Sequence, residues 1–271
     1  GSYQKPKELV WIFGCTIYLA MMAEGFLGYV LPYGQMSYWG AQVIISLFGA
    51  IPYVGESLEL WVRGDYYISG ITVSRFFALH VVALPLILIA LVFLHLVALH
   101  EVGAGNPEGV DIEEHLDDDG VPLDSVPFFP YKVLNALVAI GVFMTVFSII
   151  MFFFPEGGGY FIEMANFQEA NPLVTPDHIA PVWYYAPFYT MLRAIPDPLG
   201  GLIVMAAAVA IFFIVPWLDR SKVASIRYKG IYSKIAITLF GVSFLTLGYL
   251  GTVGVTEIRK TMSIICTIIY F

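Results

Sequence analysis

Charged residues are scarce in this sequence. They make up 13% of its 271 residues, whereas 59% of the residues are hydrophobic. A soluble domain usually carries roughly 25% charged residues. A hydrocarbon solvent demands such a low fraction, because each unpaired buried charge costs several kcal/mol. The composition therefore predicts an integral membrane protein.

Cysteine and net positive charge are also lacking. Cys15 and Cys266 both lie inside apolar runs, so we expect buried thiols, and they carry no information about disulfides. The net charge of −8 gives no indication of a nucleic-acid partner. Much of it comes from Asp111–Asp124, a stretch typical of a solvated loop.

Five apolar runs are long enough to cross a bilayer, which takes about 20 residues. They are Leu9–Leu31, Phe76–Leu99, Val133–Phe154, Leu199–Leu218 and Ile231–Tyr249, with a partial run from Met262. Met36–Val62 and Val182–Ala194 are apolar segments that glycine or proline interrupts or brackets, which predicts short helices at the membrane interface. The fold class predicted is an all-α membrane protein, a transmembrane helix bundle with short interfacial helices.

The loops and the chain ends suggest a topology. If the first long run starts in the cytoplasm, eight Lys and Arg residues lie on the cytoplasmic side and five on the opposite side. This asymmetry favours that orientation and places the interrupted segments on the periplasmic side.

The chain stops about ten residues into an apolar run. We therefore expect a fragment that lacks the N-terminal helices and the C-terminal end.

Two histidines, His80 and His95, lie on the second long run, with Pro85 between them. Fifteen residues at 100° each place them about 60° apart around the helix and about 22 Å apart along it. A histidine in a membrane helix can simply hydrogen-bond a neighbouring helix. Two histidines on roughly one face, one near each side of the membrane, fit ligands of two stacked metal cofactors better.

The first long run carries a matching pair of glycines. Gly14 and Gly28 are about 40° apart in angle and about 21 Å apart in height. Small residues of this kind are also common at helix–helix contacts in membranes. The agreement between the glycine pair and the histidine pair favours two haems. Each haem would need a second histidine from a helix outside this chain.

Three stretches of the sequence carry long and specific motifs: GYVLPYGQMSYWGAQVI (28–44), RFFALH with the later His95 (75–95) and ANPLVTPDHIAPVWYYAPFYTMLRAIP (170–196). These stretches closely resemble cytochrome b, the haem-carrying subunit of cytochrome bc complexes. The resemblance extends from the start of the chain to the fifth long run. It implies that the two leading helices of the family and the end of its last helix are absent here.

The resemblance also implies cofactor roles for the histidines and glycines. His80 would ligate a low-potential haem b near the periplasm, and His95 a high-potential haem b near the cytoplasm. The glycines resemble the haem-packing glycines of the family. Residues near the haem edges would be Trp11, Ser2 and Arg75.

Two quinone sites follow from the same resemblance. A periplasmic quinol-oxidation pocket, with Tyr184 at its centre, would be walled by Phe26, Tyr29, Gly40, Val43, Pro181, Val182, Trp183 and Tyr189. Aromatic and small residues suit a flat apolar ring with a long tail, although aromatic residues also gather at membrane interfaces without binding a ligand. A cytoplasmic quinone-reduction pocket would use His100, with Ser2 and Tyr3 nearby.

The sequence departs from the family pattern at two acidic positions. Val182 stands where the Pro-Glu-Trp-Tyr motif of the family has the glutamate that takes a proton from quinol. Glu24, inside the first apolar run, is a candidate for part of that role, because an acid in a membrane span is costly and often functional. It could instead bond to a neighbouring helix or face a haem edge. The acid of the cytoplasmic site is missing or displaced, with Asn135 as a weak replacement.

The implied activity is that of a quinol:cytochrome c oxidoreductase that couples electron transfer to proton translocation. Two haem b groups and ubiquinone would be its cofactor and substrate. Its partners would be a Rieske iron–sulfur subunit, a c-type cytochrome, a second copy of the complex and the lipid bilayer, in a bacterial inner membrane. We divide the chain into part of the haem bundle with interfacial helices (1–104), an acidic cytoplasmic loop (105–131) and helices of the quinol-oxidation site (132–271).

Two other classes of protein have features in common with this sequence. A secondary transporter or channel also has broken helices and histidines inside the membrane. A transporter or channel does not explain the matched glycine and histidine spacings. The second class is a purely structural subunit that has lost its cofactors through truncation, an alternative that stays open for a fragment.

Overall fold

The structure is a computed structural model that describes residues 3–106, 108–109, 114–159 and 161–271. Ser2 and the first residues of the acidic stretch lie outside the described residues. The chain forms two compact units, Gly1–Ala104 with Ala165–Phe271, and Gly105–Met164. Each unit is treated by itself.

Among the described residues, five helices are long and apolar enough to cross a membrane: Glu8–Val30, Gly70–Val102, Phe128–Phe153, Pro198–Leu218 and Ile231–Gly251. They correspond to the five apolar runs of the sequence. The prediction of an all-α, multi-pass membrane protein is therefore confirmed. The second of these spans is interrupted, because α4 (Gly70–Ala78) continues through a π-helical turn, η2 (Leu79–Ala83), into α5 (Leu84–Val102).

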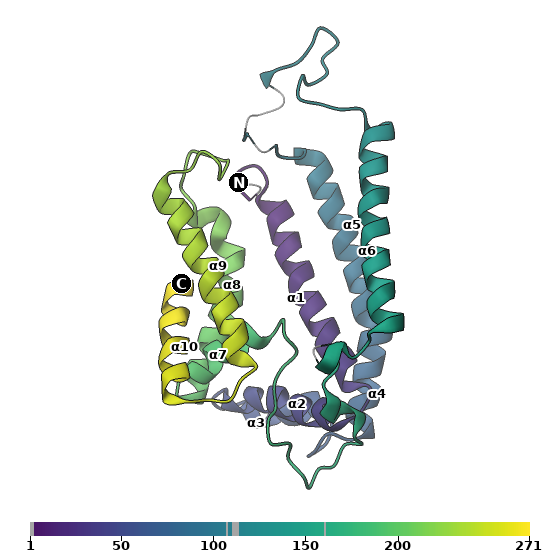
Figure 1. The fold of residues 1–271 in the computed structure, drawn as a ribbon, viewed down its shortest axis with the longest axis vertical. Helices are drawn as coiled ribbons and strands as arrows, with labels where there is room; N and C mark the ends of the chain where they lie inside the picture. The colour runs from purple at the N-terminus through teal and green to yellow at the C-terminus, as the bar shows by residue number, and fades with distance from the viewer. Residues whose placement is uncertain (1–2, 107, 110–113, 160) are drawn as a thin grey trace. The chain divides into compact units, whose positions relative to one another are not determined.

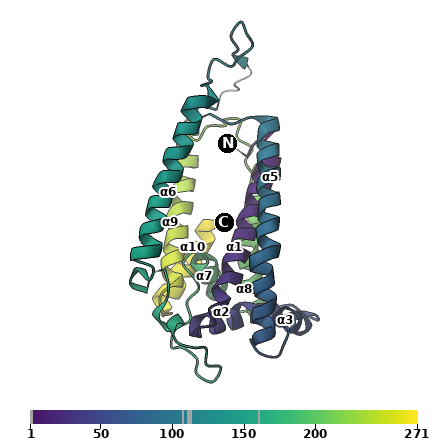
Figure 2. The same cartoon turned by 90° about the vertical axis from the view of Figure 1, so that its right-hand side faces the viewer.

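The larger unit contains two groups of packed helices. In one group, α1 (Glu8–Val30) lies along α5. In the other, α7 (Ala186–Ala194) packs against α8 (Pro198–Leu218), α9 (Ile231–Gly251) and α10 (Glu257–Tyr270), as Figure 1 shows. Contacts between α1 and α8 join the groups. Figure 2 shows α1 and α5 running side by side over most of their length.

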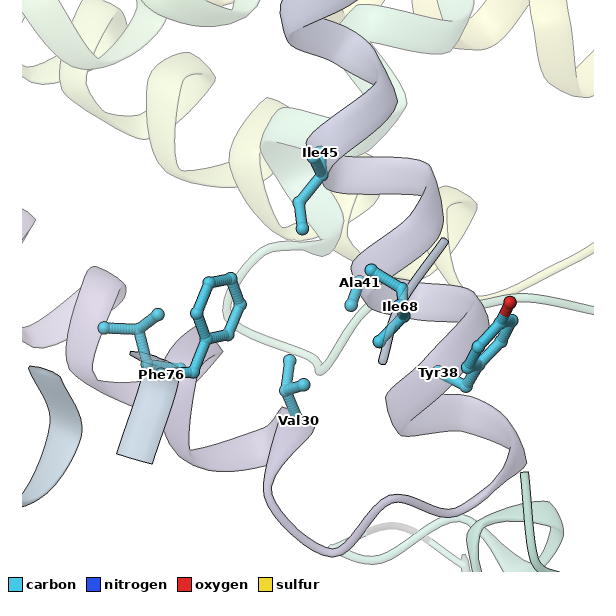
Figure 3. Packing of buried hydrophobic residues seen from close by; sticks show 7 residues of the cluster. Val30, Tyr38, Ala41, Ile45, Ile68 and Phe76 are labelled. Atoms are coloured by element: carbon cyan, nitrogen blue, oxygen red, sulfur yellow. The ribbon is translucent and has the colours of Figure 1, made fainter. Parts of the chain in front are cut away.

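Short helices lie across one end of these long helices. They are α2 (Gln35–Ser46), the 3-10 turn η1 (Leu47–Ala50) and α3 (Gly55–Arg63). A buried cluster holds α2 against the ends of α1 and α4 (Figure 3), and its members include Val30, Tyr38, Ala41, Ile45, Ile68 and Phe76. The interrupted apolar segment thus forms short helices because its breaks at glycine and proline prevent one long helix.

A later part of the chain is fastened to the start of α2. The side-chain oxygen of Asn166, on the 3-10 turn η6 (Met164–Phe167), accepts hydrogen bonds from the Ser37 amide at 2.8 Å and the Ser37 hydroxyl at 3.0 Å. Gly34 forms an antiparallel bridge with Glu169. A β-carbon at Gly34 would clash with the Asn166 carbonyl, so glycine permits this close approach. The segment leading to α7 is therefore positioned beside α2.

The smaller unit, Gly105–Met164, contains a loop and one long helix. The loop turns at Asp117, whose carboxylate accepts from the amides of Asp119 and Val121 at 3.0 and 2.8 Å. This is the local side-chain turn that aspartate favours. A π-helical turn, η4 (Phe128–Lys132), leads into α6 (Val133–Phe153), and the 3-10 turn η5 (Gly157–Gly159) follows the helix.

Candidate functional site: two glycine–histidine pairs

Gly14 and Gly28 of α1 each lie opposite one histidine of the second span. A β-carbon built on Gly28 would come within 2.5 Å of the His80 ring, which excludes any side chain at that position without movement. A β-carbon on Gly14 would meet the His95 ring at 3.5 Å, an ordinary van der Waals contact. The nearly equal spacings of the glycines and the histidines in the sequence thus correspond to two glycine–histidine pairs at two levels of one helix pair.

The helical turn at His80 explains a mismatch of one residue. The histidines are fifteen residues apart and the glycines fourteen. In the π-helical turn, the Leu84 amide donates to the Leu79 carbonyl, five residues back. The ring of Pro85 obstructs regular α-helical bonding there, and a π-helical turn holds one extra residue. The angular offset of the histidines therefore becomes about 40° rather than the about 60° derived from a regular helix, matching the glycines.

The two histidine rings have different surroundings. Nδ1 of His80 lies 3.0 Å from the Glu24 carboxylate oxygen Oε1 and 3.0 Å from the Glu24 main-chain carbonyl oxygen. Nδ1 of His95 is buried, and no described residue forms a hydrogen bond with it. Within the described residues, the second carboxylate oxygen of Glu24, Oε2, is also buried without a partner. The sequence left open a bond from Glu24 to a neighbouring helix, and the contact with His80 is such a bond. The sequence did not identify His80 as the partner.

A second contact zone lies between α1 and the turn before α7. The Tyr184 hydroxyl lies so close to Gly25 that a β-carbon there would clash with it. The Tyr185 hydroxyl donates to the Met22 carbonyl. Trp183 stands edge-on to Tyr184, with ring centroids 5.5 Å apart. Burial raises the pKa of Tyr184, so its hydroxyl remains protonated and can donate a hydrogen bond near neutral pH.

Other residues expected in the quinol pocket lie around this zone without a common contact. Phe26 packs edge-on against Phe76 of α4, with centroids 5.8 Å apart. The Tyr29 carbonyl accepts from the hydroxyl of Ser37 at the start of α2. A β-carbon on Gly40 would meet nothing within 4 Å among the described residues. Gly40 thus borders open space and is not a helix-packing glycine within this part of the chain.

The remaining candidates of this pocket have local partners. Pro181 and Val182 are partly buried in the turn before α7, where the Val182 carbonyl accepts from the Tyr185 amide at 2.9 Å. The Val43 carbonyl of α2 accepts from the Ser46 hydroxyl. The Tyr189 ring lies under the guanidinium of Arg193, 4.8 Å from the ring centroid.

At the opposite end of α1, Tyr3 belongs to a polar cluster. Its hydroxyl donates to Asp219 at 2.7 Å, and Lys229 forms an ion pair with the same carboxylate. Burial would raise the pKa of Asp219, but hydrogen bonds from Lys229, Tyr3 and the Ser221 amide outweigh it and lower the pKa to about 2. Sequence reasoning missed Asp219 and Lys229, because Tyr3 and Asp219 are 216 residues apart and no local pattern joins them.

The residues expected near the haem edges and the second quinone site differ in their contacts. The Trp11 indole donates to the Phe212 carbonyl of α8 at 2.6 Å. Arg75 donates to the Trp61 carbonyl of α3 at 2.8 Å. His100 is exposed near the end of α5. Ser2 lies outside the described residues, and Asn135 belongs to the smaller unit.

Comparisons with known proteins identify the family. The family model described as cytochrome b(N-terminal)/b6/petB matches residues 1–187, and the one described as cytochrome b(C-terminal)/b6/petD matches residues 169–271. Cytochrome b of Allochromatium vinosum is 53% identical over the whole chain and 67% of its own length. Cytochrome b of Rickettsia bellii is 46% identical over the whole chain and 65% of its own length.

A solved structure described as a hyperthermophilic respiratory Complex III is similar in fold. It has a TM-score of 0.90 and 33% identity, covering 99% of this chain and 69% of the other. The chain spans about two thirds of the length of the relatives it matches. It belongs to the cytochrome b/b6 family of bc complexes, whose members transfer electrons in the membrane and bind haem b.

The residues present fit haem binding. A β-carbon at Gly28 would overlap the His80 ring and a β-carbon at Gly14 would touch the His95 ring, so the absence of a side chain leaves space beside both rings. No group of three or more His, Cys, Asp or Glu side chains in the described ranges could hold a metal ion by itself. Each histidine could hold a haem as its single ligand from this chain.

Proposed function

We propose that this chain is the part of a bc-complex cytochrome b that oxidises quinol on the periplasmic side. It passes one electron to a Rieske iron–sulfur subunit and the other to a quinone on the cytoplasmic side. Protons are released on the periplasmic side and taken up on the cytoplasmic side. The observation that carries the proposal is the pair of glycine–histidine contacts at two levels of α1 and the second span.

In this proposal, His80 and His95 would each hold one of two separate b haems. The haems, when bound, supply one-electron carriers between the two faces of the membrane. Gly28 leaves room for the His80 ring, and the π-helical turn holds that ring at the angle set by the glycines. The apolar helices around them exclude water and lower the dielectric constant near the cofactors.

The quinol pocket is proposed where the turn before α7 meets α1. The protonated Tyr184 hydroxyl and the Trp183 ring offer a donor and a flat apolar face. Glu24 lies one residue from Gly25, which borders Tyr184, and its oxygen Oε2 has no partner in the described chain. A buried carboxylate oxygen without a hydrogen-bond partner is able to accept a proton. We therefore assign to Glu24 part of the proton-accepting role of the family's glutamate, whose position Val182 occupies here.

The partners and the location follow from the same reading. A c-type cytochrome receives electrons from the Rieske subunit, two copies of the complex form a dimer, and ubiquinol is the substrate. The membrane is a bacterial inner membrane, with α2, α3 and α7 on its periplasmic side. His100 and Tyr3 serve the quinone-reduction site on the opposite side.

The test is a reduced-minus-oxidised visible spectrum of the full-length protein in its complex, combined with quinol:cytochrome c turnover. We expect two b-type haem signals with distinct potentials and turnover that depends on added quinol. A spectrum without b-type bands, or with a single haem, would refute the proposal of two stacked cofactors. Two haems without quinol-dependent turnover would refute the quinol-oxidation assignment alone.

A further inference from the structure

One contact in the larger unit has no place in the mechanism above. Glu24 of α1 faces the ring of His80 with both of its oxygen-bearing groups: the carboxylate oxygen Oε1 and the main-chain carbonyl oxygen each lie 3.0 Å from Nδ1. The two residues are 56 positions apart in the sequence, so packing of the two helices creates the contact.

The chemistry of an imidazole makes this contact informative. A neutral imidazole has one N–H donor and one acceptor nitrogen, and the partner of one nitrogen decides which is which. Two acceptors opposite Nδ1 favour the tautomer with the proton on Nδ1. The lone pair then remains on Nε2, the nitrogen that would bind iron. A carboxylate opposite the N–H also raises the basicity of the ligand nitrogen.

His95 provides the comparison within the same helix. Its Nδ1 is buried, and none of the described side chains or carbonyls accepts from it. A β-carbon added at Gly14 would meet the His95 ring at ordinary van der Waals distance, whereas one added at Gly28 would overlap the His80 ring. The chain therefore provides an orienting carboxylate for only one of the two proposed ligands.

We propose that Glu24 is a positioning residue for His80, which fixes the tautomer and orientation of the ring and lowers the reduction potential of the haem bound there. The inference rests on the proposed function for the assignment of His80 as a ligand. A more basic ligand nitrogen stabilises ferric over ferrous iron, which is the direction needed for the haem of lower potential.

The test is an equilibrium redox titration of the b haems in the intact complex, for wild type, Glu24→Gln and Glu24→Ala. Glutamine keeps an acceptor but removes the charge, and alanine leaves only the main-chain carbonyl. We expect the potential of the haem at His80 to rise in the order wild type, Gln, Ala, and the electron paramagnetic resonance signal of that ferric haem to shift with it. The haem at His95 should keep its potential.

Glu8→Gln is the matched control, because Glu8 is the other acidic residue of α1 and lies in its first turn. It should move neither potential. Selective loss of the His80-side haem signal in a Glu24 variant, with the His95-side signal retained, would also support the positioning role. Unchanged potential and resonance signal in both Glu24 variants would overturn it. Because these readouts need no turnover, they remain separate from the quinol-oxidation assignment, and absence of haem from wild type would instead refute the proposed function.

Discussion

The two ends of the α1–α5 helix pair are built differently around equivalent histidines. At the His80 end, a β-carbon added at Gly28 would overlap the ring, Nδ1 faces Glu24, and a π-helical turn adjusts the register. At the His95 end, a β-carbon added at Gly14 would lie at van der Waals distance from the ring, and Nδ1 has no partner in the described part of the chain.

The spacing in the sequence makes His80 and His95 look equivalent, whereas helix packing gives their rings different surroundings. Matching glycines leave similar space at two levels of a helix pair. The contacts around each histidine ring decide how firmly that ring is held. Tight packing and a hydrogen-bond acceptor at the His80 end predict a rigid ligand. The looser surroundings of His95 predict a ring whose position depends more on its cofactor.

The largest expected effect tests whether the two ends act separately. His80→Leu and His95→Leu should each abolish one b-haem signal and leave the other, because each histidine would serve one haem. Difference spectra of the full-length complex measure this. His100→Leu, on the same helix, should keep both signals. Retention of both haems in His80→Leu would contradict the assignment.

The second prediction compares the glycines. Gly28→Ala should destabilise the protein by about 1–3 kcal/mol, because the added carbon overlaps the His80 ring. Gly14→Ala should be close to neutral, since its carbon fits at 3.5 Å from His95 and alanine favours a helix. Thermal unfolding midpoints and haem retention give the measurement. Equal effects of the two substitutions would remove the proposed difference in tightness.

The third prediction concerns proton transfer at the His80 end. Glu24→Gln should slow quinol:cytochrome c turnover by about tenfold or more and change its pH profile, because glutamine cannot accept the proton. Adding Val182→Glu should restore much of the rate. Steady-state turnover against pH, with haem content measured in parallel, decides the matter. A wild-type rate and profile with intact haem would show that Glu24 is not the acceptor.

The fourth prediction separates ligand space from folding near the same end. Gly40→Ala should weaken binding of pocket-directed inhibitors by about tenfold, the effect of one methyl group on a close fit. Thermal stability should not fall, because the added carbon meets nothing within 4 Å in the described chain. Gly70→Ala, also in open space, is the control and should leave inhibitor affinity unchanged. Unaltered inhibitor binding in Gly40→Ala would remove Gly40 from the pocket.

The smallest expected effect lies beyond the His95 end, in the Tyr3–Asp219–Lys229 cluster. Asp219→Asn should lower stability by about 1 kcal/mol at pH 7, because the ion pair is partly exposed. The pKa of Asp219 falls from 3.8 to about 2 on folding. Its contribution is therefore complete above about pH 4 and lost as the pH falls through about 2.

Thermal unfolding midpoints of wild type and Asp219→Asn should converge over that acidic range. Asp118→Asn, an exposed acid of the other unit, is the control and should show no such convergence. A constant difference between wild type and Asp219→Asn at every pH would mean that the carboxylate charge is not what stabilises the cluster.

The five spans and the candidate ligands could be predicted from the residues alone. Long apolar runs must become helices in a membrane, where every backbone polar group needs an internal partner. Helical geometry then fixed that Gly14 and Gly28 could match His80 and His95. Pro85 was a usable signal for the π-helical turn, because proline disrupts regular helical bonding. Its effect on the register needed the structure.

Contacts between groups on different helices could not be predicted in this way. Three contacts join residues that are far apart in the sequence. They are Glu24 with His80, the Tyr184 hydroxyl beside Gly25, and the hydrogen bond from Tyr3 to Asp219. No local pattern encodes such pairs, because they depend on how two helices pack and on where loops return. The sequence thus predicts two histidines in similar positions. Packing places a carboxylate beside the ring of His80, and no described residue bonds to Nδ1 of His95.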